Sequence, residues 1–251
     1  MLHDVRSEPL DLLRRRIAAL DAPTRASGSL PFGIAAVDVR LADKGLALGA
    51  LHEVAPAAPT LAADAATTLF LAGIVARAAP EAPVLWVLTR FDLYAPGIEQ
   101  AGLPPDRLLF AQARDDKEVL GVMEDGLRHG GLAAVVGETR RVDMTASRRL
   151  QLAAGEGRTP ALLLRRWRKL GACPLTAPSA ASTRWRIGCA PSAPLGIPGV
   201  GRPRWTVELV RQRNGNPFTF ILEGCDAEGR LGLPAPAGDR AAGADDHVRA
   251  A

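Results

Sequence analysis

The chain has 251 residues, of which 47% are hydrophobic, and this is long enough for one α/β domain with a full core. Its net charge is +4 and its pI is near 9.4, and almost all of the positive charge comes from arginine. The cysteines Cys173, Cys189 and Cys225 are far apart, which argues against a zinc site or a disulfide framework and favours a cytoplasmic protein.

Residues 9–20 are predicted to form an amphipathic helix ahead of the main domain. Their apolar residues recur at helical spacing, with arginines between them, and a polar connector follows over residues 21–29. The early acid and the lack of an apolar core argue against a signal peptide. The helix either packs on its own domain or docks on another chain, and we take docking as the hypothesis for Leu10, Leu13, Ile17 and Leu20.

Between residues 51 and 166, short apolar segments alternate with helical ones. Strands are predicted at 51–54, 82–88, 107–111, 131–138 and 159–166, and the intervening helices include one that begins at Thr67 and Thr68. The apolar run 61–79 contains Asp64 and Arg77, as expected of a buried helix and not of a membrane span. Strands that are apolar on both faces predict an α/β fold with a mostly parallel sheet flanked by helices.

After residue 166 the pattern changes to alternation of apolar and polar residues. The segments 183–192, 204–213 and 217–224 therefore predict antiparallel strands at an edge of the sheet. From residue 234 the composition is rich in Ala, Gly, Pro and Asp, which predicts a disordered tail. The expected organisation is a helix and linker over 1–28, a core domain over 29–233 and the tail over 234–251.

The order of these segments resembles the RecA core, and more closely the ImuA family of RecA-like bacterial proteins. The segment "GSLPFGIAAVDVRLADKGLALGALHEV" is similar to the part of RecA that enters its P-loop, and "VELVRQRNGNPFTFIL" resembles a RecA strand pair. Four further strings look like ImuA: "LWVLTRFDLYAPGIEQAGLPPDRLLFAQA", "GLAAVVGETRRVDMTASRRLQLAA", "PALLLRR" and "SAASTRWRI". The shared order extends from about residue 29 to 233 and implies a RecA-like core.

The loop that should bind phosphate lacks its functional residues. A P-loop uses glycines so that its backbone N–H groups can surround the phosphates, and a lysine as the counter-charge. Aligned on Thr67, the glycine positions hold Thr60 and Ala65, and the lysine position holds Ala66. Asp64 adds negative charge where phosphate would bring more. Thr67 and Thr68 are interpreted as a helix N-terminus whose hydroxyls satisfy backbone donors.

Two further positions of the site depart from the RecA-like pattern. The resemblance implies an acid that activates water after the second core strand, but Arg90 stands there. It also implies an aspartate that holds magnesium at the end of another strand, where this chain has Gly137, with Glu138 one position later. Asp64, Asp92 and Glu138 are therefore given no catalytic role. The chain is predicted to neither bind nor hydrolyse ATP, and no cofactor or metal is expected.

The segment from Arg158 to Arg213 has eleven basic residues and one acid, Glu208, and three tryptophans that each adjoin an arginine. Such a surface fits single-stranded DNA or a protein partner, and the short link between residues 138 and 145, where RecA has a DNA-contacting loop, favours a protein. Trp185 and Trp205 lie in alternating strands and are predicted to be core. The predicted binding residues are Arg165, Arg166, Trp167, Arg168, Lys169, Arg184, Arg186, Arg211 and Arg213.

Arginines 165, 166 and 168 follow a buried strand, so their head groups are expected to reach solvent. Replacing all three by alanine is accordingly expected to weaken binding and to leave the fold intact.

The ImuA resemblance implies a non-catalytic adaptor in SOS-induced translesion DNA synthesis. Its implied partners are an ImuB-type protein, which is an inactive relative of Y-family polymerases, an error-prone DNA polymerase and RecA itself. No membrane partner is expected. Two alternatives stay open: a SulA-like inhibitor of cell division, whose relatives are shorter, and a RecA-like NTPase or DNA-binding protein with an atypical P-loop.

Overall fold

The computed structural model describes residues 28–167, 171–192, 199 and 201–234. The tail beyond residue 234 lies outside the described part of the chain. So do the predicted docking helix and two of the predicted binding residues, namely Leu10, Leu13, Ile17, Leu20, Arg168 and Lys169.

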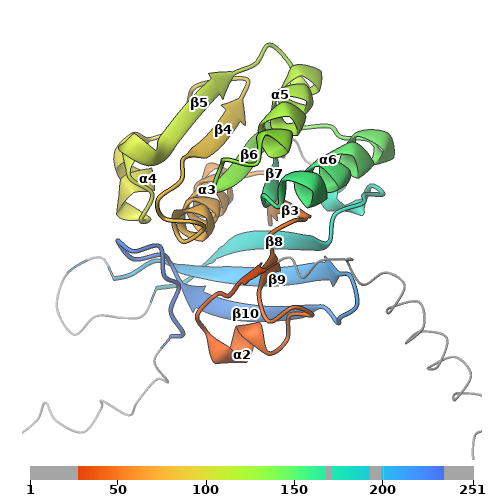
Figure 1. The fold of residues 1–251 in the computed structure, drawn as a ribbon. Helices are drawn as coiled ribbons and strands as arrows, with labels where there is room; N and C mark the ends of the chain where they lie inside the picture. The colour runs from red at the N-terminus through yellow and green to blue at the C-terminus, as the bar shows by residue number, and fades with distance from the viewer. Residues whose placement is uncertain (1–27, 168–170, 193–198, 200, 235–251) are drawn as a thin grey trace, which may run out of the picture.

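The main sheet has eight strands in the order β10-β9-β8-β3-β7-β6-β4-β5 (Figure 1). The six strands from β8 to β5 all run in the same direction. Strand β9 is antiparallel to β8, and β10 is antiparallel to β9. The predicted α/β class, mostly parallel sheet and antiparallel edge are confirmed. The strands are β3 (Leu51–Pro56), β4 (Val84–Leu88), β5 (Leu108–Gln112), β6 (Ala134–Thr139), β7 (Ala161–Arg165), β8 (Thr183–Ala190), β9 (Arg204–Gln212) and β10 (Phe218–Glu223).

Helices cover both faces of this sheet, as its doubly apolar central strands require. One face carries α3 with α4, and the other carries α5 and α6. A two-stranded antiparallel sheet of β1 and β2 and the short helix α2 precede β3. The remaining elements are β1 (Ser29–Leu30), α2 (Ala35–Asp38), β2 (Leu46–Ala47), α3 (Leu61–Ala76), α4 (Ala95–Gln100), α5 (Asp116–His129) and α6 (Met144–Gly157), with 3-10 turns η1 (Pro105–Arg107) and η2 (Pro174–Thr176).

The core on the α3 face is built around aromatic rings. Trp185 lies with its ring centroid 5.3 Å from Phe32 and 6.2 Å from Phe70, and Trp205 meets Phe70 edge-on at 6.4 Å. Trp185 and Trp205 are 1% and 3% exposed, which confirms that both belong to the core. Neither ring is available to stack on a nucleic-acid base, because alternation along β8 and β9 turns them inward.

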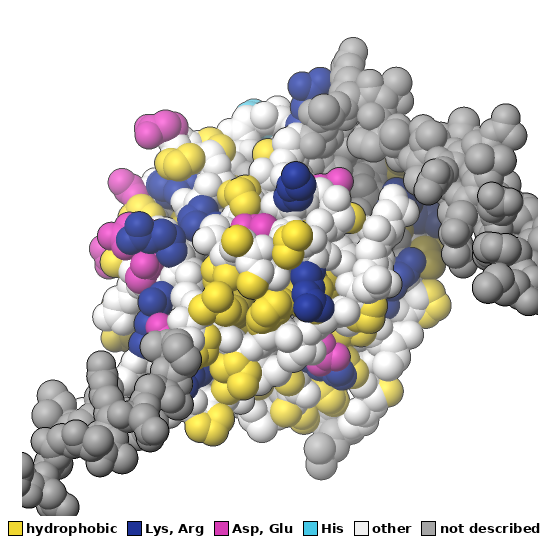
Figure 2. All heavy atoms as spheres, turned by 90° about the horizontal axis from the view of Figure 1, so that it is seen from below, with side chains coloured by type: hydrophobic (Ala, Val, Ile, Leu, Met, Phe, Trp, Pro, Cys, Tyr) yellow, Lys and Arg dark blue, Asp and Glu magenta, His cyan; other side chains and the backbone are white. Residues whose placement is uncertain are grey.

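The two edges of the main sheet differ in how they are covered. At β10, the Glu223 N–H donates to the Gly232 carbonyl at 2.8 Å, and Arg40 lies 5.8 Å from the centroid of the Phe220 ring. Figure 2 views this side and shows hydrophobic side chains with basic side chains set among them. At the other edge, β5 pairs with β4 alone among the described strands. Within the same residues, no helix has the length and hydropathy needed to cross a membrane.

His52 is a buried polar residue in the middle of the sheet. Its Nδ1 is 2.7 Å from Thr183 Oγ1 and its Nε2 is 2.9 Å from the Ala47 carbonyl oxygen. Because the carbonyl only accepts, we assign the hydrogen to Nε2 in the neutral ring, and the Thr183 hydroxyl donates to Nδ1 while accepting from Trp185 Nε1 at 2.7 Å. Burial lowers the pKa of His52 from 6.5 to about 4.

This pKa predicts an acid-dependent loss of stability. Below pH 6.5 the unfolded histidine binds a proton that the folded one does not accept until near pH 4, so the stabilisation is present above pH 6.5 and declines toward pH 4. Between pH 7 and pH 5 the free energy of unfolding should fall by about 2 kcal/mol from this group. Urea titrations of the wild type and of His52→Gln at both pH values isolate the contribution, and equal losses in the two proteins would contradict it.

Candidate functional site at the strand ends

Helix α3 begins earlier than the sequence suggested, so the residues predicted to form a degenerate P-loop are mostly helical. The helix starts at Leu61, and Thr60 is its N-cap, with Oγ1 accepting from the Ala63 N–H at 3.2 Å. The predicted start at Thr67 and Thr68 is therefore wrong. Their hydroxyls donate to the carbonyls of residues 63 and 64 at 2.6 and 3.0 Å, within the helix.

The residues at the former loop positions are thus part of a regular helix. Ala65 is exposed on α3 and Ala66 is buried in the core, 4% exposed. Only residues 57–60 connect the end of β3 to the start of α3. A phosphate cradle needs several consecutive backbone N–H groups that point outward, but in a helix the N–H groups beyond the first turn are bonded to carbonyls four residues earlier.

Packing against strand β6 explains why Gly137 occupies the position where the resemblance implied an acid. A Cβ on Gly137 would lie 2.0 Å from the sulfur of Met123, so helix α5 packs directly on this backbone. Strand alternation turns the next residue, Glu138, to the opposite face, where α3 lies. There Glu138 Oε1 accepts from Trp86 Nε1 at 2.9 Å. Gly137 is a packing requirement of this fold.

Arg166 fills the space between α3 and the ends of β6 and β7. Its Nη1 lies 3.2 Å from Asp64 Oδ2, and its Nε donates to Glu138 Oε2 at 2.9 Å. All three side chains are at most 10% exposed. Burial alone lowers the pKa of Arg166, but the ion pairs with Glu138 and Asp64 outweigh it and raise this pKa above its ordinary value. A permanent cation therefore joins Asp64 and Glu138, next to the segment that was predicted as a degenerate P-loop.

A second buried ion cluster lies on the opposite face of the sheet and is centred on Glu53 of β3. Glu53 is 0% exposed, and its two oxygens lie 3.0 Å from Arg165 Nη1 and 2.7 Å from Arg184 Nη2. Ser179 also donates to Glu53 at 3.0 Å. The geometry follows from strand order, because β3 lies between β7, which carries Arg165, and β8, which carries Arg184. Burial lowers the pKa of Arg165, although the charge on Glu53 opposes the shift.

These two clusters correct the prediction that the arginine head groups reach solvent. Arg165 and Arg184 are 3% and 5% exposed, and the Arg166 side chain is 10% exposed. Together the clusters contain three arginines and three acids, so they add no net charge to the surface. The triple substitution of Arg165, Arg166 and Arg168 was expected to leave the fold intact because their head groups were expected to reach solvent. Two of these side chains are buried, so that reason no longer holds.

The predicted binding residues that do lie at the surface come from β8 and β9. Arg186 is paired with Glu208 through bonds of 2.7 and 2.6 Å, and both side chains are about one-third exposed. Arg211 and Arg213 are exposed near the end of β9, and Trp167 is half-buried. The basic surface that the sequence predicted is therefore reduced, among the described residues, to a smaller one around Arg211 and Arg213.

Small cavities remain beside the Arg166 cluster. One of about 360 Å³ lies between α3 and α4 and is mostly apolar, with Leu61, Leu93 and Tyr94 in its lining and Asp64 and Arg166 at one side. A smaller one of about 30 Å³ is lined in part by Arg90, Asp92, Glu138 and Arg166. Arg90 is exposed and lies at its edge. The cavities at the strand ends are therefore partly apolar and lined by both acids and arginines, and they offer little room for a triphosphate.

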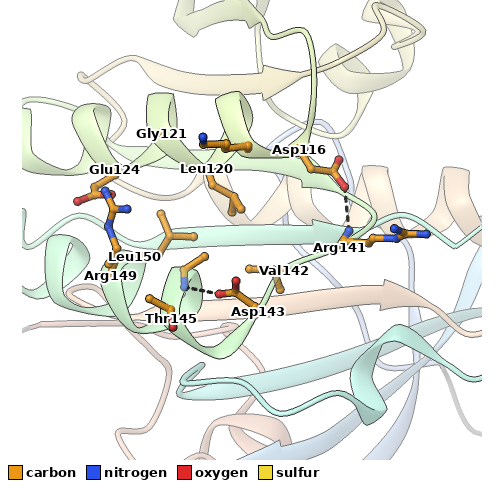
Figure 3. A pocket seen from close by; sticks show the side chains of 12 residues that line it. Asp116, Leu120, Gly121, Glu124, Arg141, Val142, Asp143, Thr145, Arg149 and Leu150 are labelled. Carbon is orange, nitrogen blue, oxygen red and sulfur yellow. Dashed lines mark hydrogen bonds and ion pairs between the residues drawn. The ribbon is translucent and has the colours of Figure 1, made fainter.

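A larger groove, of about 700 Å³, runs between α5 and α6 on the other face of the molecule (Figure 3). Leu120 and Leu150 form its floor, and Asp116 accepts from the Arg141 N–H at 2.9 Å at one end. Glu124 is buried beneath the rim and pairs with Arg149 at 2.6 Å. The sequence contains no motif that signals this groove.

Comparison with known proteins shows a similarity to ImuA over part of the chain. No family model matches the chain. Over 110 residues it is 44% identical to the Protein ImuA of Caulobacter vibrioides, in strain NA1000 / CB15N and in strain ATCC 19089 / CIP 103742 / CB 15. The chain is similar to ImuA over this segment. The resemblance to ImuA predicted from the sequence is confirmed over this segment, which is 42% of the chain and spans just under half, 45%, of these curated relatives.

The sequence predicted a degenerate nucleotide site by position, but it did not predict the ion clusters that the structure shows there. Thr60, Ala65, Ala66, Arg90 and Gly137 were identified by position, and the structure gives most of them a structural role in α3 or β6. Glu53 and the pairing of Arg166 with Asp64 and Glu138 were not predicted. The one available signal was the presence of acids in otherwise apolar segments, such as Glu53 in "LHEV".

Proposed function

We propose that this protein is a non-catalytic, RecA-like adaptor of an ImuA–ImuB mutagenesis system in SOS-induced translesion DNA synthesis. Its relation to ImuA supports the choice of system. The observation that carries the non-catalytic part is the Arg166 cluster, in which an internal guanidinium binds both Asp64 and Glu138. Magnesium and phosphate would each have to compete with buried ion pairs that already neutralise the charges of these groups.

The nucleotide prediction is tested by calorimetry with ATP or ADP and magnesium, together with an ATPase assay. We expect no binding at micromolar concentrations and no turnover, because α3 occupies the loop positions and Ala66 offers no charge. Arg166→Ala serves as a matched variant, since it removes the internal cation without restoring a P-loop, and it too should not bind. Saturable binding by the wild type that is lost in Thr60→Pro would overturn the proposal and favour an atypical NTPase.

As an adaptor, the protein would act by contact with an ImuB-type protein, an error-prone polymerase and RecA. The exposed arginines at the end of β9 are the part of the predicted basic surface best placed to make such a contact. A tagged chain co-expressed with the ImuB-type protein of the same genome should retain it on affinity resin. Arg211→Glu with Arg213→Glu should weaken this capture at least about tenfold, as expected for loss of a charged contact at an interface.

Arg90→Glu is the matched control, because Arg90 is exposed and follows β4, which four strands separate from β9 in the sheet. Capture that Arg90→Glu reduces as much as the β9 variant does would show that net charge, and not the β9 surface, matters. Capture of single-stranded DNA by the wild type, falling steeply with added salt and lost in the β9 variant, would assign this surface to nucleic acid instead.

A further inference from the structure

The outer edge of β5 has the features of an unsatisfied sheet edge. An edge strand presents unpaired backbone N–H and C=O groups, and proteins normally protect such strands with charge, proline or a bulge. The strand reads "LLFAQ", which contains neither charge nor proline. Leu109 is 48% exposed and Phe110 is 38% exposed, and Phe91, which is 61% exposed, meets Phe110 edge-on at 4.9 Å.

The direction of the backbone groups along β5 can be deduced from its contact with β4. The Ala113 N–H donates to the Leu88 carbonyl at 2.8 Å, so this residue faces β4. Backbone groups of successive strand residues point to opposite sides. The N–H and C=O groups of Phe110 and Gln112 therefore point away from β4. In Figure 1, β5 is the outermost strand on this side of the sheet.

From this geometry we propose that two copies of this chain associate through β5, antiparallel across a twofold axis at Phe110, so that their main sheets join into one. Such an interface is isologous, with the same strand used by both copies. The outward N–H and C=O of Phe110 bond to those of Phe110 in the second copy, and the flanking positions pair Leu108 with Gln112. The exposed rings of Phe91 and Phe110 are buried from both sides in the dimer.

Charge at the ends of the strand specifies this partner and this register. With Phe110 on the axis, Asp106 of one copy lies beside Arg114 of the other, and the twofold repeats the contact. Asp106 is exposed, and the Arg114 side chain is 87% exposed and pairs with Glu118 at 2.9 Å on the surface. A parallel arrangement would instead place Arg114 beside Arg114. The sequence around β5 is thus self-complementary in the antiparallel sense alone.

The experiment is sedimentation velocity on the full chain over a wide concentration series. A reversible monomer–dimer equilibrium is expected. Phe110→Lys places two like charges on the axis and should weaken dimerisation at least about tenfold. Asp106→Arg should also weaken it, and the double change Asp106→Arg with Arg114→Asp should restore it, because it exchanges the two charges across the interface.

Two controls separate this interface from other modes of association. Ile221→Lys introduces the same charge at the opposite edge, where Ile221 is 51% exposed on β10, and should leave the dimer unchanged. Deletion of residues 1–24 should also leave it unchanged, which distinguishes it from association through the predicted N-terminal helix. A chain that is monomeric at every concentration overturns the proposal. So does a dimer that Phe110→Lys leaves intact while thermal melting shows both proteins folded.

Discussion

Replacement of Glu53 by alanine is expected to lower the free energy of unfolding by about 3–5 kcal/mol, because it leaves two buried guanidinium groups without their counter-charge. Arg165 and Arg184 are 3% and 5% exposed and cannot turn to solvent without moving β7 or β8. Since domains of this size are stable by only about 5–15 kcal/mol, the change should remove a large part of the total. Urea denaturation followed by circular dichroism measures it.

Two comparisons show whether burial of charge is the cause. Glu208→Ala breaks a pair that is one-third exposed and should cost no more than about 1 kcal/mol. The combined change Glu53→Leu, Arg165→Met and Arg184→Leu removes every charge of the cluster and should recover most of the loss, because apolar replacements of similar volume avoid the desolvation cost. A Glu53→Ala protein within about 1 kcal/mol of the wild type would contradict the prediction.

The strands and most helices could be predicted because their burial leaves a local pattern. Segments such as "VLWVL" are apolar on both faces, and only a covered parallel sheet hides both. The alternation in β8 and β9 was equally direct, and it placed Trp185 and Trp205 in the core. The start of α3 was missed for a specific reason. Residues 59–66, "PTLAADAA", contain a good N-cap at Thr60 and strong helix formers, but the likeness to a P-loop suggested a later start.

The burial of these arginines in ion pairs could not be predicted from the local sequence pattern, because their partners are distant in sequence. Arg165 and Glu53 are 112 residues apart, and they meet only because β7 is the neighbour of β3 in the sheet. A run such as "LLLRRWRK" normally marks the point where a strand reaches solvent, since arginine is rarely buried unless paired. The pairing partners, Glu53, Asp64 and Glu138, each looked like an isolated acid until the strand order was known.

Breaking the Arg166 cluster is expected to have a second large effect on the free energy of unfolding, and this effect should depend on pH. Arg166→Ala leaves Asp64 and Glu138 close together, each less than 10% exposed, and is expected to cost about 3–5 kcal/mol at pH 7. Two carboxylates in one buried site raise the pKa of one of them, so in this variant the folded state gains a proton more readily than the unfolded chain as the pH falls. The deficit relative to wild type should therefore be smaller at pH 5 than at pH 7.

Urea titrations of both proteins at neutral and acidic pH measure this difference, and the contribution of His52 cancels because both retain it. Adding Asp64→Asn and Glu138→Gln to Arg166→Ala should restore stability at neutral pH and abolish the pH dependence of the deficit. Arg148→Ala, an exposed arginine on α6, should have almost no effect at either pH. If the Arg166→Ala deficit were the same at pH 7 and pH 5, the loss would come from packing of the side chain and not from the charge that links the two acids.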